Sequence, residues 1–106
     1  LQSDERFAES FVRWRKGRGQ GPVRIAQELK LRGVDPRLLD QHLDRNDDDW
    51  YTLCAEVARS RFGRKPAQDF REKAQRMRFL QYRGFSSAQI SRCLRGGAEL
   101  DDIDES

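Results

Sequence analysis

The chain has 106 residues, of which 37% are charged and 36% hydrophobic, and its formal net charge is +3. This length suits one domain or a few small repeats with a common core, and it leaves no room for a large internal cofactor cavity. No apolar run approaches the roughly 18 residues that a membrane-spanning helix needs. We therefore exclude an integral membrane protein and expect no signal segment.

The positive and negative charges are segregated along the chain. Residues 1–32 hold eight basic and four acidic side chains, and residues 33–58 hold two and seven. Residues 59–83 hold nine and two, and residues 84–106 hold two and five. Two basic blocks separated by acidic ones favour a polyanionic partner.

The first residues of the chain predict two helices. No segment alternates apolar and polar residues over the length of a strand. An apolar stripe at i, i+4 and i+7 predicts the first helix and consists of Phe7, Phe11 and Trp14. Gly21-Pro22 begins the second helix, because proline suits the first helical position, and Gly33 ends it as a left-handed cap. The inward face of the second helix consists of Ile25, Ala26 and Leu29.

Two further helices follow. Asp35-Pro36 begins a short helix that carries Leu38, Leu39 and Leu43. Acidic residues 47–49 place negative charge where the dipole of the next helix favours it. The apolar stripe of that helix consists of Trp50, Leu53, Cys54, Val57, Ala58 and Phe62.

The last predicted helices resemble the second and third. A stripe of the same period consists of Phe70, Ala74, Met77 and Leu80. Gly84 then ends this helix as Gly33 ends its counterpart. Ser86 and Gln89 have the spacing of a capping box, which opens a helix through Ile90 and Leu94.

These elements form an internal repeat. A shift of 51 residues places Leu29 on Leu80, Gly33 on Gly84 and Leu39 on Ile90. Neither unit could bury its apolar face alone. We therefore predict an all-α fold of two tandem three-helix repeats, helix-turn-helix-like, over residues 1–46 and 47–95. Residues 96–106 are predicted to be an acidic, flexible tail.

The cysteines and the histidine favour packing over chemistry. Cys54 and Cys93 lie among apolar helical positions and are predicted to be buried free thiols, as in a cytoplasmic protein. His42 falls on the repeat position of Cys93, which indicates a half-buried packing site. Two cysteines and one histidine cannot fill a closed zinc site. We expect no metal.

Two other patterns also have structural explanations. The acidic residues 47–49 lack the spaced ligands and the glycine of a calcium loop, so helix capping explains them better. Gly17, Gly19 and Gly21 have GxGxG spacing, but no strand precedes them, so they indicate a connection between helices. We therefore predict that the protein is not an enzyme and binds no cofactor.

The basic residues give the sharper prediction of a binding surface. Dense clusters end the first helix and its counterpart in the second repeat, and the helix dipole explains part of this clustering. Because the cluster recurs in both repeats, we predict a surface that faces a polyanion. Its predicted members are Arg13, Arg15, Lys16, Arg18, Arg24, Arg32, Arg59, Arg61, Arg64, Lys65, Arg76, Arg78 and Arg83.

A second interpretation concerns DNA. The ranges 24–43 and 75–94 resemble helix-turn-helix motifs, whose second helix enters the major groove. Residues 33–45 carry three acidic and two basic side chains, which disfavours a groove-reading helix. A stand-alone DNA-binding module of tandem helix-turn-helix type remains the alternative. Most aromatic residues are predicted to be core, with Phe79 and Tyr82 left open as base-stacking candidates.

The chain resembles the RecX family. The stretch GQGPVRIAQELK over residues 19–30, followed by residues 32–34 (RGV), resembles the family's central repeat. Asp49-Trp50, residues 61–63 (RFG) and residues 78–86 (RFLQYRGFS) resemble its last repeat. The resemblance covers about residues 4–95. The family has a further repeat before the position of Asp4, and the contacts of that repeat are not assigned to this chain.

The resemblance implies a function. RecX proteins regulate the bacterial RecA recombinase in DNA repair, recombination and the SOS response. The expected activity is binding to the RecA filament on DNA and inhibition of filament extension, ATP hydrolysis and strand exchange. Such a protein would be cytoplasmic and non-catalytic, with RecA and DNA phosphates as partners. The absence of a heptad seam leads us to expect a monomer.

Overall fold

A computed structural model describes residues 4–95, and within this range the regular structure is entirely helical. The helices are α1 (Asp4–Gly17), α2 (Pro22–Leu31), α3 (Pro36–His42), α4 (Asp48–Phe62) and α5 (Phe70–Arg83), followed by a helix over residues 87–95. The prediction of an all-α fold of tandem three-helix repeats is confirmed. None of the described helices is long and apolar enough to cross a membrane. The predicted tail lies outside the described residues.

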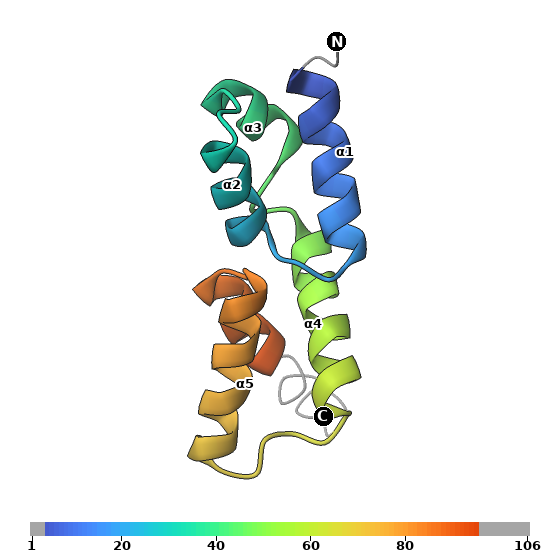
Figure 1. Cartoon of the computed structure of the whole chain (residues 1–106). Helices are drawn as coiled ribbons and strands as arrows, with labels where there is room; N and C mark the ends of the chain where they lie inside the picture. Colours follow the sequence, from blue (N-terminus) through green and yellow to red (C-terminus); the bar gives the residue numbers. More distant parts are fainter. Residues whose placement is uncertain (1–3, 96–106) are drawn as a thin grey trace.

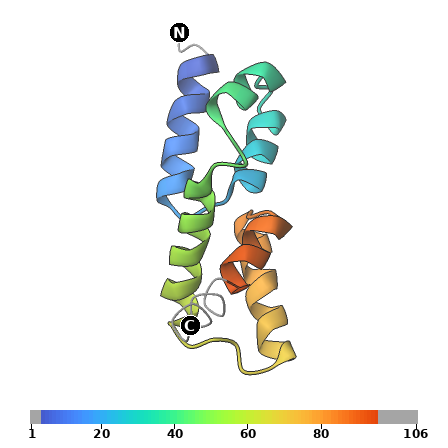
Figure 2. The same ribbon diagram turned by 180° about the vertical axis from the view of Figure 1, so that it is seen from behind.

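The helices form two groups that stack end to end. In the first group α1, α2 and α3 pack on one another, and in the second α5 packs on α4 beside the helix of residues 87–95 (Figure 1). From behind, α4 continues the line of α1, and α5 lies below α2 (Figure 2). The molecule is elongated as a result, with extents of 55 × 28 × 19 Å.

The helix ends follow the sequence signals. The Asp35 and Asp47 carboxylates accept hydrogen bonds from backbone N–H groups two residues later, at 2.8 and 2.9 Å. Ser86 and Gln89 form the predicted capping box, with bonds of 2.9 and 3.1 Å between each backbone N–H and the other side chain. Gly84 adopts the left-handed conformation, with a φ of 100°.

The core of the first repeat includes a residue from the second. Trp50, on α4, is 3% exposed, and its indole N–H donates to the Asp44 carbonyl at 2.8 Å. The first turn of α4 thus closes the space between α1, α2 and α3. The buried members of this cluster are Ala8, Phe11, Ile25, Ala26, Leu29, Val34, Leu39, Leu43 and Trp50.

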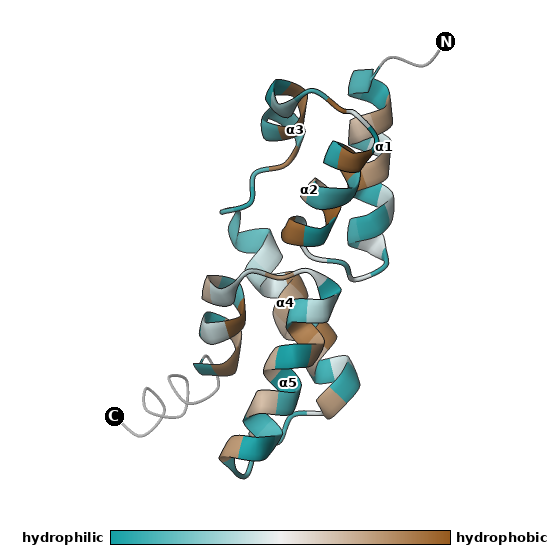
Figure 3. Ribbon diagram, turned by 60° about the vertical axis from the view of Figure 1, so that its left-hand side comes forward, coloured by the Kyte–Doolittle hydropathy of each residue, from teal (hydrophilic) through white to brown (hydrophobic). Residues whose placement is uncertain are grey.

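Within residues 4–95, the core of the second repeat is smaller. Its fully buried members are Cys54, Leu80, Phe85 and Ile90. Half-buried side chains such as Met77 and Leu94 complete it. Hydrophobic positions alternate with hydrophilic ones along the helices, as amphipathic helices require (Figure 3).

Two residues on the predicted apolar stripes are exposed, which corrects those predictions. Phe70 is 85% exposed because it is the first residue of α5, at the far end of the helix from the core residue Leu80. Trp14 is 54% exposed and was predicted to be core. The guanidinium of Arg15 lies 4.7 Å from its ring and that of Arg18 lies 5.8 Å away, so cations cover part of the ring surface.

A close backbone approach joins the two repeats. The N–H of Gly21 donates to the Arg83 carbonyl at 2.8 Å, and the N–H of Val23 donates to the Gly84 carbonyl at 2.9 Å. A Cβ on Gly21 would overlap the Gly84 carbonyl, and a Cβ on Gly84 would overlap the Arg24 side chain. Glycine is therefore needed on both sides of this contact.

Candidate interaction surface

A hollow of about 480 Å³ lies where the two repeats meet. We call it the junction groove. Arg18 enters it from the loop after α1, Arg61 from α4, and Arg83 from the last turn of α5. Leu53, Val57 and Phe79 supply its apolar lining. The fold thus brings together three of the predicted basic residues, from three different segments of the chain.

The contacts of the three arginines leave their charges without a carboxylate partner among the described residues, and the Arg18 guanidinium also lies 5.8 Å from the ring of Trp14, which does not line the groove. The Arg83 guanidinium donates to the Arg18 carbonyl at 3.1 Å. The guanidiniums of Arg61 and Arg83 each lie 5.3 Å from the centre of the Phe79 ring. Within residues 4–95, none of the three makes an ion pair with a carboxylate. The groove therefore concentrates positive charge on an apolar base.

Two of the predicted basic residues belong to the fold and not to a surface. Arg76 is 8% exposed, and its guanidinium donates to the Lys65 carbonyl at 3.0 Å and to Glu72 at 2.8 Å. The Arg15 side chain is 17% exposed and lies 2.9 Å from the Glu28 carboxylate. Both guanidiniums are committed to internal partners. We therefore remove these two arginines from the predicted surface.

Lys16 and Arg24 bridge between elements while staying partly accessible. The Lys16 ammonium lies 3.8 Å from an Asp49 oxygen and 4.8 Å from the Trp50 ring centre, which ties α1 to α4. Arg24 lies 3.6 Å from Glu28 and donates to the Tyr82 carbonyl at 3.3 Å, across the contact between the repeats. Each of these two cations is therefore paired with a carboxylate of the fold.

The remaining predicted residues are exposed outside the groove. Arg13 pairs with Glu9 at 3.1 Å, and Arg32 lies against the rings of Phe7 and Phe11. The others occupy the end of α4, the loop after it and the middle of α5; they are Arg59, Arg64, Lys65 and Arg78. The predicted set therefore does not gather in one place.

Residues that line the groove were missed by the charge-based prediction. Leu53, Glu56, Val57 and Ser60 all come from α4. Their spacing of i, i+3, i+4 and i+7 places them on one helix face, which is the signal that could have found them.

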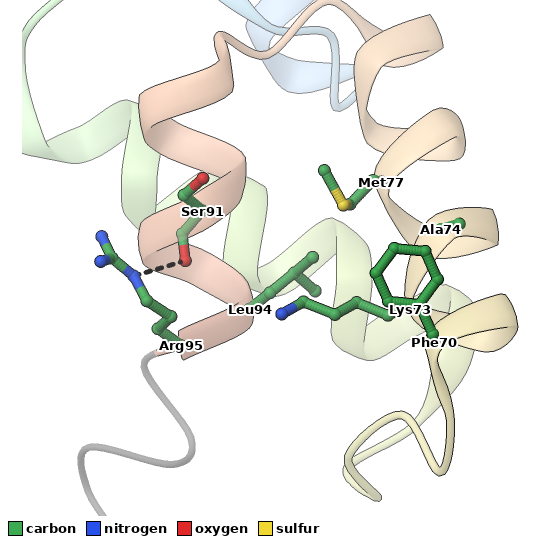
Figure 4. A pocket seen from close by; sticks show the side chains of 7 residues that line it. All are labelled: Phe70, Lys73, Ala74, Met77, Ser91, Leu94 and Arg95. Atoms are coloured by element: carbon green, nitrogen blue, oxygen red, sulfur yellow. Dashed lines mark hydrogen bonds between the residues drawn. The ribbon is translucent and has the colours of Figure 1, made fainter.

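A second, more apolar hollow of about 340 Å³ lies between α5 and the helix of residues 87–95. Its lining includes Phe70, Met77 and Leu94, with Lys73 and Arg95 beside them (Figure 4). The Arg95 guanidinium donates to the Ser91 carbonyl at 3.2 Å. Two basic side chains line this hollow, and three line the junction groove. Lys73 and Arg95 do not belong to the predicted basic surface.

The histidine and the cysteines occupy packing positions. His42 is half-buried, with its Nε2 3.4 Å from a Glu5 oxygen. Cys54 is buried, as predicted, whereas Cys93 is half-buried, and both are free thiols. In the described part of the chain, no three histidine, cysteine or acidic side chains are grouped so that they could hold a metal ion.

The two thiols influence each other. The pKa of Cys54 is raised, first by its hydrogen bond to Cys93 and second by burial. The same hydrogen bond lowers the pKa of Cys93, and burial opposes this shift. Arg59 lowers the pKa of Cys93 further through its charge. Cys93 is thus the more acidic of the pair.

Comparisons with known proteins agree with this architecture. The family model of the second three-helix domain of RecX matches residues 3–43, and that of the third three-helix domain matches residues 47–94. Proteins named "Regulatory protein RecX" are 45% identical in Pseudomonas entomophila (strain L48), over 91% of this chain, and 45% identical in Halorhodospira halophila, over 96%. The relative in Legionella pneumophila (strain Corby) is 37% identical over 89%.

The chain spans 62–63% of the length of these three relatives. The matched domains are consecutive, and each corresponds to one group of three helices in the structure. The matches therefore extend over both repeats and over their order. The chain belongs to the RecX family.

Proposed function

We propose that the protein binds the RecA filament on DNA and inhibits the recombinase, as a non-catalytic regulator of DNA repair and recombination in the cytoplasm. Membership of the RecX family, through two consecutive three-helix domains, is the observation that carries this proposal. The relatives are named regulatory proteins, which supports a regulatory role. RecA and DNA as partners follow from the family resemblance.

Unpaired cations supply the physical basis of binding. Arg18, Arg61 and Arg83 converge in the junction groove, while Arg64 and Lys65 are exposed beyond the end of α4. Arg61 precedes Arg64 and Lys65 by three and four residues, so the two groups lie close together at the end of α4. We infer that these cations contact the filament together, so that the bound protein restrains filament growth. Charge attraction also speeds such an encounter.

A charge-reversed variant tests this surface. Arg18→Glu, Arg61→Glu, Arg64→Glu and Lys65→Glu together change exposed residues that make no ion pair among the described residues. We expect this variant to lose inhibition of RecA ATP hydrolysis on single-stranded DNA. Reversal of Arg15 or Arg76 is avoided, because their internal hydrogen bonds would be broken.

A matched control separates local from overall charge. Arg37→Glu, Arg45→Glu, Arg71→Glu and Lys73→Glu together give the same net charge at exposed positions outside the predicted surface. We expect this control to inhibit as the unmodified chain does. Circular dichroism establishes that both variants are folded. Full inhibition by the folded surface variant would contradict the assignment of the surface.

A further inference from the structure

The structure assigns the junction groove to an acidic protein segment. We propose that it binds carboxylate side chains of the protein partner, with an apolar side chain beside them, and not the phosphates of DNA. This inference rests on the proposed function. It specifies that the protein partner, and not DNA, binds in the groove. Four features support this proposal. They are the arginines without ion pairs in the described residues, the apolar base of the groove, the carboxylate of Glu56 and the contacts that surround the Phe79 ring.

The arginines provide the attraction for carboxylates. Arg18, Arg61 and Arg83 make no ion pair within the described residues, and Glu56 is the single acidic side chain that lines the groove. A guanidinium is a planar set of donors that matches a carboxylate in two parallel hydrogen bonds. The groove therefore has donors for more than one carboxylate.

The rest of the lining favours a peptide over a nucleic-acid backbone. Leu53 and Val57 are half-buried and give the groove an apolar base, which an apolar side chain can cover. Glu56 accepts hydrogen bonds but donates none. A peptide main chain offers it N–H donors, whereas a phosphodiester backbone offers none.

The Phe79 ring is not available as a platform for bases. The guanidiniums of Arg61 and Arg83 each lie 5.3 Å from its centre, and the Phe62 ring meets it in a T-shaped contact at 5.4 Å. Binding of single strands without sequence preference uses aromatic rings on which bases stack. Here cations and a second ring already surround the aromatic side chain.

Contacts within the chain position the groove. Gly19 has a φ of +80°, and a Cβ there would lie 3.1 Å from Val57 and 3.4 Å from the Arg83 guanidinium. This glycine lets the loop after α1 approach α4 and α5, where the Arg18 carbonyl receives Arg83. Groups that are already positioned lose less conformational entropy on binding.

The test compares two probes on the whole chain. Fluorescence anisotropy measures the affinity for a short labelled peptide of alternating acidic residues and leucines, and for a single-stranded oligothymidylate of similar charge. We expect Arg61→Glu to weaken peptide binding about tenfold, because it replaces an attractive charge by a repulsive one. The oligothymidylate is expected to lose far less affinity.

Arg59→Glu is the matched control. Arg59 lies one half-turn earlier in the last turn of α4, is exposed and does not line the groove. Reversal at either position has a similar effect on the helix dipole. Arg59 acts on Cys93 and does not line the groove, so its reversal leaves the charge of the groove lining unchanged. We expect Arg59→Glu to change peptide affinity by less than about twofold. Backbone amide shifts of Gly17, Gly19 and Ser60 on peptide addition locate the binding.

The outcomes separate this inference from the proposed function. Absence of RecA inhibition by the unmodified chain would contradict the proposed function itself. If the chain inhibits RecA, the groove inference is overturned by equal peptide affinity of Arg61→Glu and Arg59→Glu. It is also overturned if Arg61→Glu mainly weakens the oligothymidylate, which would make the groove a nucleic-acid site. A selective loss of peptide affinity with groove amide shifts supports it.

Discussion

The two repeats share a plan but not a core. Among the described residues, the hydrophobic cluster of the first has nine buried members, whereas that of the second has four. One of the nine is Trp50, which the sequence pattern places at the start of the second repeat. The first repeat thus depends on the second for its closure. The predicted boundary between residues 46 and 47 therefore does not separate two independent hydrophobic cores.

Gly33 and Gly84 occupy equivalent positions in the two repeats but have different surroundings. Both end the middle helix of their repeat, and both have positive φ angles, of 83° and 100°. A Cβ on Gly33 would meet no atom within 4 Å, but one on Gly84 would overlap Arg24. Equivalent positions therefore share a backbone conformation while only one of them forms the contact between repeats.

Removal of the Trp50 side chain is expected to have the largest effect. Trp50→Ala leaves a large cavity between the helices of the first repeat, and it should lower the free energy of unfolding by about 3–5 kcal/mol. Urea denaturation measures this loss. Amide hydrogen exchange should show faster opening of α1, α2 and α3. Unchanged exchange in these helices would contradict the shared core.

Alanine substitutions at Gly33 and Gly84 test whether the contact between the repeats contributes to stability. Gly33→Ala introduces strain from its positive φ alone and should cost about 1–2 kcal/mol. Gly84→Ala adds the overlap with Arg24 and should cost about 3 kcal/mol or more. Thermal or urea unfolding of the two variants, side by side, gives the difference. Equal losses would mean that the contact between the repeats adds nothing to stability.

Gln89 connects the repeats through its side chain. It forms the capping box with Ser86, and its amide group donates to the Arg45 carbonyl at 2.9 Å. Gln89→Ala should therefore lower the free energy of unfolding by about 1–2 kcal/mol. The exposed Gln27→Ala is the control and should change it by less than about 0.5 kcal/mol. A loss no larger than that of the control would refute this role.

The smallest expected effect concerns Cys93, which occupies the repeat position that His42 occupies in the first repeat. Cys93 has a lowered pKa and is half-buried, while Cys54 is buried with a raised pKa. Because a lowered pKa populates the thiolate at lower pH, alkylation of Cys93 should begin below the pH of an ordinary thiol. Mass spectrometry after iodoacetamide treatment should find Cys93 modified first. Equal rates at both cysteines would contradict the difference.

Local features of the fold were predictable from the sequence, and long-range ones were not. The capping box of Ser86 and Gln89 and the glycine at position 84 depend on neighbouring residues, so spacing revealed them. The burial of Arg76 depends on the loop carbonyl of Lys65, eleven positions away, and charge counting treats it as any surface arginine. The junction groove needs three segments to meet, which periodicity does not specify.

RecA ATP hydrolysis on single-stranded DNA, titrated with this chain, tests the central claim most directly. We predict inhibition well below the amount of protein needed to coat the DNA, because the chain acts on the filament. The inhibition should also persist at moderate salt. Inhibition only at coating amounts, and its loss at moderate salt, would indicate competition for phosphates. That result would contradict the account and favour a stand-alone DNA-binding module.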